Sequence, residues 1–141
     1  MGVNRVRRGY AASVSMTGAG LPAERCNIGP AEIARRRRIA IVLSVASIAL
    51  AVALVASGVP HLFRALLWPV AAGAAVSWFQ VRRRFCIRFG AAGVENLGPI
   101  GSTTPVDRPL AEQDRRRANQ LLTEGVLAGL LAAVALVNLP L

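Results

Sequence analysis

The stretch that decides the fold is IAIVLSVASIALAVALVAS, residues 39–57, which runs for 19 residues without a charged side chain. At about 1.5 Å of rise per residue, a helix of this length nearly matches the ~30 Å hydrocarbon core of a bilayer. Two more apolar stretches lie further along the chain, LFRALLWPVAAGAAVSWF (62–79) with one charge and LLTEGVLAGLLAAVALVNL (121–139) with one charge.

Three such runs in a chain of 141 residues exceed what a soluble core of this size can bury. The sequence therefore predicts an all-α integral membrane protein with three transmembrane helices, a hairpin plus one. Gly125, Gly129 and Ala133 recur every four residues on the third run and predict a face for close helix packing, within the chain or against another subunit. Pro69 predicts a kink in the second helix.

The charges lie almost entirely outside these runs. The formal net charge is +10, and all 17 basic residues are arginine. Eight arginines precede the first run and eight lie between the second and third, whereas the link 58–61 has none. The positive-inside rule then predicts a multi-pass protein of the cell inner membrane, with a cytoplasmic N-terminus and long loop and the C-terminus outside. Arg64 is expected to snorkel to the outer headgroups.

These features divide the chain into four parts. We expect a disordered basic cytoplasmic tail (1–34), a transmembrane helical hairpin (35–81), a cytoplasmic interfacial loop (82–106) and a helix extending into the third span (107–141). The tail contains no apolar run of about 7–15 residues, so a cleaved signal peptide is not expected.

The loop begins with RRRFCIRFGAAGVENLG, residues 82–98. Alternation of Phe85, Ile87 and Phe89 favours a short strand, which residues 94–97 would complete as a β-hairpin; a helix ended by Gly90 is equally compatible. In either shape we expect the loop to lie on the membrane surface, with its apolar side chains toward the lipid. The lipid- or partner-binding candidates are Arg82, Arg83, Arg84, Phe85, Cys86, Arg88, Gly90, Gly93 and Asn96.

No catalytic, cofactor or metal site is predicted. The glycines of the loop do not match the spacing of phosphate-binding loops. Arg84 and Arg88 flank Cys86 and would favour its thiolate. However, the single histidine, His61, is expected across the membrane, so Cys86 lacks both a general base and zinc ligands. A packing cysteine is the expected role.

The arginine runs 35–38 and 115–117 adjoin apolar helices. Anionic lipid headgroups are therefore the expected partner, at roughly 1 kcal/mol per charge near the surface. Nucleic acid is not expected, because no stacking aromatic side chains are interleaved with these runs. Glu124 falls about one helical turn inside the bilayer, where it either serves ion coupling or pairs with an arginine of 82–84.

The loop and the last apolar helix resemble those of a group of small uncharacterised prokaryotic multi-pass membrane proteins. These carry F-C-x3-G-x2-G-x2-N after a transmembrane helical hairpin, then an acidic-basic helix before a last span. The matching positions are Phe85, Cys86, Gly90, Gly93, Asn96, Asp114 and Arg115. The resemblance covers residues 35–141 and implies fold and location, but no activity.

The function expected from these features is that of an accessory or assembly subunit of a membrane complex, with a basic cytoplasmic loop that binds lipid or partner. The alternative is a small transporter or channel formed by oligomerisation, with Glu124 as the coupling acid, since three spans cannot enclose a pathway. A membrane enzyme using Cys86 is the weakest hypothesis, because no general base is available to it.

Overall fold

The computed structural model describes residues 26–140. In chain order the elements are α1 (Pro30–Ala56), the 3₁₀ helix η1 (His61–Leu66), α2 (Leu67–Arg82), α3 (Ile87–Ala92), β1 (Val94–Glu95), β2 (Thr104–Pro105) and α4 (Arg108–Val137). Three helical stretches, 30–56, 61–82 and 108–137, are long and apolar enough to cross a membrane. The chain is therefore mostly helical, as predicted, with one small sheet.

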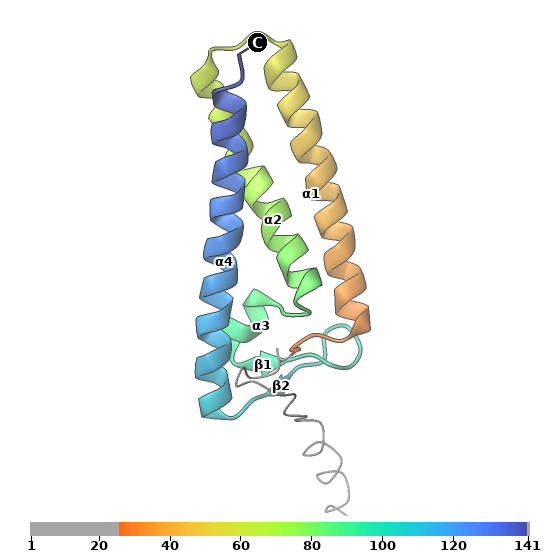
Figure 1. Cartoon of the computed structure of the whole chain (residues 1–141). Coiled ribbons are helices and arrows are strands. Elements are labelled where there is room, and N and C mark those ends of the chain that lie inside the picture. The colour runs from red at the N-terminus through yellow and green to blue at the C-terminus, as the bar shows by residue number, and fades with distance from the viewer. Residues whose placement is uncertain (1–25, 141) are drawn as a thin grey trace, which may run out of the picture.

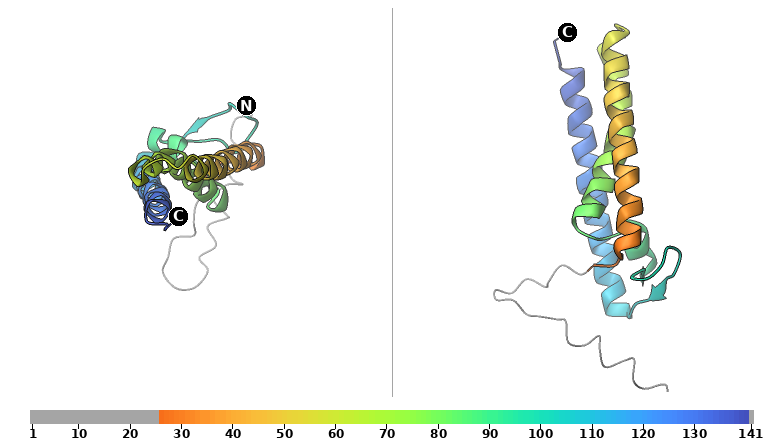
Figure 2. Two further views of the ribbon diagram at one scale, coloured as in Figure 1. Left: turned by 90° about the horizontal axis from the view of Figure 1, so that it is seen from above. Right: turned by 90° about the vertical axis from the view of Figure 1, so that its right-hand side faces the viewer.

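The three long helices lie side by side, and α2 packs against both α1 and α4 (Figure 1). α1 and α4 run in the same direction and α2 runs back between them. α3 and the two strands lie at the end of the bundle where α1 begins and α2 ends (Figures 1 and 2). Because of this connectivity, the arginine runs 35–38, 82–84 and 115–117 gather toward that end.

Small residues set the distance between α2 and α4. Gly125, Gly129 and Ala133 are all buried. A Cβ on Gly129 would collide with the backbone of Ala72, and a Cβ on Gly125 would collide with Val76. The third long helix therefore packs closely on the chain's own second helix, the geometry that small residues at spacing four permit.

By contrast, α1 packs on α2 along one side and leaves most of its surface exposed. Its buried residues are Glu32 and Ala40, out of 27. The most apolar 18-residue window of α1 has a mean hydropathy of 2.8 and is only 6% buried. Side chains such as Val42 and Ile48 are about two-thirds exposed, at 65% and 66%. An apolar helix this exposed has nothing within the described chain to cover it.

One local expectation from the sequence is wrong and another is met in part. Pro69 does not kink the middle of a helix, because α2 begins at Leu67 and the proline occupies its first turn, where no backbone donor is lost. Of the two shapes left open at Phe85–Phe89, the strand does not form, since residues 87–92 are helical. The loop does contain a small antiparallel sheet, in which β1 pairs with β2 and Val94 lies opposite Pro105.

The expected boundary of the N-terminal tail is also wrong. Residues 1–25 lie outside the described part of the chain, but α1 begins at Pro30, and Asn27, Ile28 and Gly29 are buried before it. Proline suits this position because a first-turn residue needs no N–H acceptor. At the start of α4, Asp107 is the N-cap residue and Pro109 lies in the first turn, although the Asp107 side chain makes no capping hydrogen bond.

Arg64 does not extend outward as expected. Its side chain is 4% exposed, and Nη1 donates to the backbone oxygens of Leu136 and Leu139, at 3.4 and 3.1 Å. These carbonyls belong to the last turn of α4 and the residues after it, where a cation is favourable and acceptors lack helical partners. Arg64 therefore ties η1 to the end of α4.

The contact between α2 and α4 yields a first prediction. Gly129→Leu forces a side chain into the backbone of Ala72 and is expected to lower the free energy of unfolding by about 2 kcal/mol or more. Thermal unfolding followed by circular dichroism in detergent measures this. Ala132→Leu, on an exposed face of the same helix, is the matched control and should be nearly neutral. Equal losses in both variants would contradict the packing assignment.

Candidate functional site

The end of α2 fixes the start of the loop. α2 closes with a Schellman motif: Arg84 N–H donates to the Val81 carbonyl at 3.3 Å, and Phe85 N–H donates to the Gln80 carbonyl at 3.0 Å. Arg84 occupies the left-handed position of this motif with φ 48°, where glycine is usual. The motif reverses the chain sharply and directs Phe85 back toward the bundle.

Phe85 is the centre of the core at this end. Its side chain is fully buried and packs with Ala118 and Leu121 of α4, and the Arg117 guanidinium carbon lies 4.9 Å from the ring centroid. The expectation that Phe85 rests against lipid is therefore wrong. The ring faces inward because the Schellman turn and α3 enclose it.

Two of the loop glycines have separate structural reasons. A Cβ on Gly90 would lie 2.5 Å from Cζ of the Phe85 ring, so only glycine leaves room for that ring. Gly93 has φ 68°, the left-handed conformation that ends α3 and starts β1. These positions serve packing and turn geometry, and neither presents a group to a ligand.

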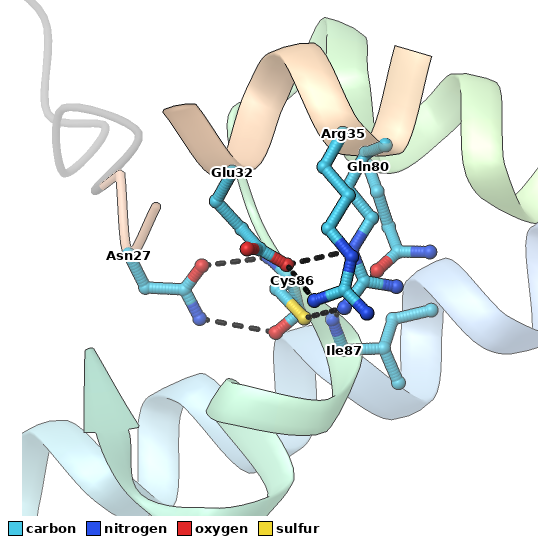
Figure 3. A network of polar contacts seen from close by, with 7 residues as sticks. Asn27, Glu32, Arg35, Gln80, Cys86 and Ile87 are labelled. Atoms are coloured by element: carbon cyan, nitrogen blue, oxygen red, sulfur yellow. Dashed lines mark hydrogen bonds and ion pairs between the residues drawn. The ribbon is translucent and has the colours of Figure 1, made fainter. Parts of the chain in front are cut away.

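Asn27 holds the backbone of Cys86 at two points (Figure 3). Its Oδ1 accepts from Cys86 N–H at 2.6 Å, and its Nδ2 donates to the Cys86 carbonyl at 3.1 Å. The next backbone donor, Ile87 N–H, is accepted by Gln80 Oε1 at 3.2 Å. The Cys86 carbonyl also accepts from Gly90 N–H at 2.9 Å, but the two N–H groups would otherwise lack a partner, which costs roughly 1–3 kcal/mol for a buried donor.

The thiol of Cys86 faces the start of α1. Arg36 Nη2 donates to Cys86 Sγ at 3.0 Å, and Arg36 Nε lies 3.3 Å from Glu32 Oε1. Arg35 lies 3.8 Å from the same carboxylate, whose residue is 1% exposed. The cation beside the sulfur is therefore Arg36, not Arg84 or Arg88 as the sequence suggested. We name Asn27, Glu32, Arg36, Gln80 and Cys86 the Cys86 cluster.

Asn96 completes the link between the N-terminal segment and the loop. Gly29 N–H donates to the Asn96 carbonyl at 2.7 Å, and Asn96 N–H donates to the Asn27 carbonyl at 2.9 Å. A Cβ on Gly29 would lie 2.8 Å from the Leu97 carbonyl oxygen. Residues 27–29 thus lie alongside the loop like an added strand, and Asn96 acts inside the fold and not at its surface.

Glu124 is paired. Its Oε2 lies 2.9 Å from Arg83 Nη2, and its Oε1 accepts from Gln120 Nε2 at 3.0 Å. Both charged side chains are one-third exposed, at 33% each. Of the two roles left open by the sequence, this geometry corresponds to the ion pair with the 82–84 run.

The site residues predicted from sequence thus separate into two groups. Phe85, Cys86, Gly90 and Asn96 are buried and hold the loop together, whereas Arg82, Arg84 and Arg88 are exposed. Asn27, Glu32, Arg36 and Gln80 were not predicted as site residues from the sequence. Glu32, the one acid beside four arginines and at helical spacing from Arg36, was the available clue.

The chemistry open to this cluster is limited. Cys86 is fully buried, so a substrate cannot reach its sulfur in this conformation. Within residues 26–140, no group of three or more His, Cys, Asp or Glu side chains is arranged to hold a metal ion. Comparison of the chain with protein-family models, with curated proteins and with solved structures gave no match.

The Cys86 cluster predicts that Asn27 matters more than the thiol. Asn27→Ala leaves the Cys86 N–H without its partner, whereas the Cys86 carbonyl keeps the hydrogen bond from Gly90 N–H, so the expected cost is roughly 1–3 kcal/mol. Cys86→Ser keeps an acceptor for Arg36 and is expected to cost less than about 1.5 kcal/mol. Chemical denaturation in detergent measures both. Asn119→Ala, an exposed asparagine on α4, is the control; a Cys86→Ser loss larger than that of Asn27→Ala would contradict this ranking.

Proposed function

We propose that this chain is an integral membrane protein that serves as an accessory or assembly subunit of a larger membrane complex. The observation that carries the proposal is the exposed apolar surface of α1, whose most apolar 18-residue window is 6% buried and has a mean hydropathy of 2.8. Such a surface is stable only against lipid or another apolar protein face. The two apolar windows of the other long helices, 28% and 22% buried, leave further surface of the same kind.

The charge distribution supports one orientation. The arginine-rich end carries α3, the strands and the start of α1, and the opposite end carries the link 57–60 (Figure 1). The positive-inside rule places the first end in the cytoplasm and the C-terminus of α4 outside. The cell inner membrane is the location we propose, with anionic headgroups around the arginine-rich end.

This orientation is open to a direct test. Reporter fusions after residues 60, 100 and 141 are expected to lie outside, inside and outside, because the arginine-rich loop stays in the cytoplasm. A reporter pair such as alkaline phosphatase and green fluorescent protein, each active on one side only, measures this. Replacing Arg82, Arg83 and Arg84 with glutamine is the perturbation control and should weaken the preference. A cytoplasmic reporter after residue 141 would contradict the three-span arrangement.

An accessory role and a transport role differ in the assembly that each requires. Three helices packed as α1–α2–α4 have no enclosed pathway, so transport needs several copies. The carboxylate of Glu124 is already neutralised by Arg83 at 2.9 Å, which favours a structural pair over a coupling acid. The accessory role needs instead an uncovered apolar surface, and α1 provides one.

The accessory and transport roles predict different masses for the extracted complex and different ion fluxes in liposomes. After extraction in mild detergent, we expect the chain in a complex of fixed composition with a larger membrane protein, measured by light scattering and mass spectrometry. A pure homo-oligomer that carries proton or ion flux in liposomes, lost in Glu124→Gln but kept in Glu112→Gln, would establish the alternative and overturn the accessory role. Glu112 is the matched control because it is exposed and lies on the same helix.

A further inference from the structure

A cavity of about 570 Å³ lies beside the first turns of α1, next to the Cys86 cluster but separate from it. The cluster's five residues do not line it. Its wall combines the segment before α1, one side of α1 and the turn after α2. The lining residues used in the argument are Ile28, Ile33, Ile41, Arg37, Arg38 and Arg84. The volume is in the range of small-molecule sites, about 300–1,000 Å³.

The three arginines of this cavity have no acidic partner in the described part of the chain. Glu32 is occupied by Arg35 and Arg36, and Glu124 is occupied by Arg83. No acidic residue lines the cavity, and within residues 26–140 no carboxylate lies within ion-pair distance of Arg37, Arg38 or Arg84. Three arginines among the residues that line one cavity favour an anion, and the planar guanidinium suits phosphate in particular.

The backbone of Arg84 adds an independent observation. It is a non-glycine residue at the left-handed position of the Schellman turn, with φ 48°. Glycine would close the same turn without strain, so the arginine carries a conformational cost there. The residue that carries this cost belongs to the turn after α2, and it lines the cavity together with Arg37 and Arg38 of α1.

The apolar and the charged residues of the cavity follow one another along the axis of α1. Ile33, Arg37 and Ile41 are spaced by four and lie along one face of α1. Ile41 is on the side of the arginines that leads into the apolar length of α1, and Ile33 is on the side of the helix start. A ligand that fills this hollow is therefore charged at the level of Arg37 and apolar toward Ile41.

We propose that this cavity binds one anionic glycerophospholipid, with its phosphate among Arg37, Arg38 and Arg84 and the beginning of an acyl chain against Ile41. This inference rests on the membrane location given under the proposed function and specifies the lipid-binding part of that function. The proposed site is not the set of loop residues that the sequence suggested. It lies where the start of α1 is next to the turn after α2. A soluble phosphate would leave the apolar part of the cavity unused.

Binding to the purified full-length chain tests the proposal. The chain in neutral detergent is titrated with dioleoyl phosphatidylglycerol, with dioleoyl phosphatidylcholine and with glycerol 3-phosphate, and native mass spectrometry counts the bound molecules. We expect one phosphatidylglycerol per chain, at least about tenfold tighter than the zwitterionic lipid, since several charges act together near the surface. Equal binding of the two lipids, or displacement of the lipid by glycerol 3-phosphate at matching concentration, would overturn the proposal.

Three variants distinguish one lipid bound in the cavity from non-specific electrostatic attraction. Replacing Arg37, Arg38 and Arg84 with glutamine is expected to abolish the preference, whereas replacing Arg82, Arg88 and Arg116 removes the same charge from exposed positions outside the cavity and should preserve it. Ala34→Trp keeps every arginine but fills the hollow, and should also lower binding about tenfold. Equal loss in both triple variants, or unchanged binding in Ala34→Trp, would show that no lipid is seated there.

Failure of this inference is distinguishable from failure of the proposed function. A chain that leaves membranes on alkaline extraction would overturn the membrane location itself. A chain that stays in the membrane and co-purifies with a larger protein, yet binds the two lipids equally, would overturn the lipid site alone.

Discussion

Asn27 makes the contact on which the arginine-rich end of the molecule depends. One amide side chain satisfies both backbone groups of Cys86, while its own backbone carbonyl accepts from Asn96. Three segments far apart in sequence thereby share one set of hydrogen bonds: residues before α1, the turn after α2 and the stretch after α3. Backbone polar groups where apolar helices end must find partners, and here Asn27 supplies two of them and Gln80 supplies another.

The charges at this end are arranged by the same need for partners. Two buried or half-buried acids, Glu32 and Glu124, each neutralise an arginine of a neighbouring run. The Glu124 pair links α4 to the end of α2, whereas the Glu32 pairs lie within α1 and hold Arg36 beside Cys86. Since the acids are few, Arg37, Arg38 and Arg84 stay without a carboxylate partner among residues 26–140.

Long-range features of the fold were predictable because they depend on composition over many residues. The three apolar runs predicted three long helices, and the small residues at spacing four on the last run lie at a helix contact. The loop was less predictable. Alternation at Phe85, Ile87 and Phe89 is compatible with a strand, but α3 forms because the Schellman turn buries Phe85 and Asn27 takes the Cys86 donor that a strand would need.

The candidate site was predictable only in part for a related reason. Arginine runs stand out in a sequence, whereas the partners that decide which arginines are neutralised come from distant segments. Asn27 and Cys86 are 59 residues apart, and Arg36 and Cys86 are 50 apart. Nothing in the local pattern around residue 27 reveals such a contact, since an asparagine before a glycine and a proline is typical of an ordinary turn.

The separation of 59 residues between Asn27 and Cys86 also has a consequence for the order of folding. Closing a loop of that length from a free chain has an entropic cost that the two hydrogen bonds alone offset poorly. Antiparallel packing of α1 on α2 brings the two positions together beforehand, so the bonds complete a hairpin that has already formed. The Asn27 bonds therefore lock a helical hairpin whose packing has already met most of the cost of closing the loop.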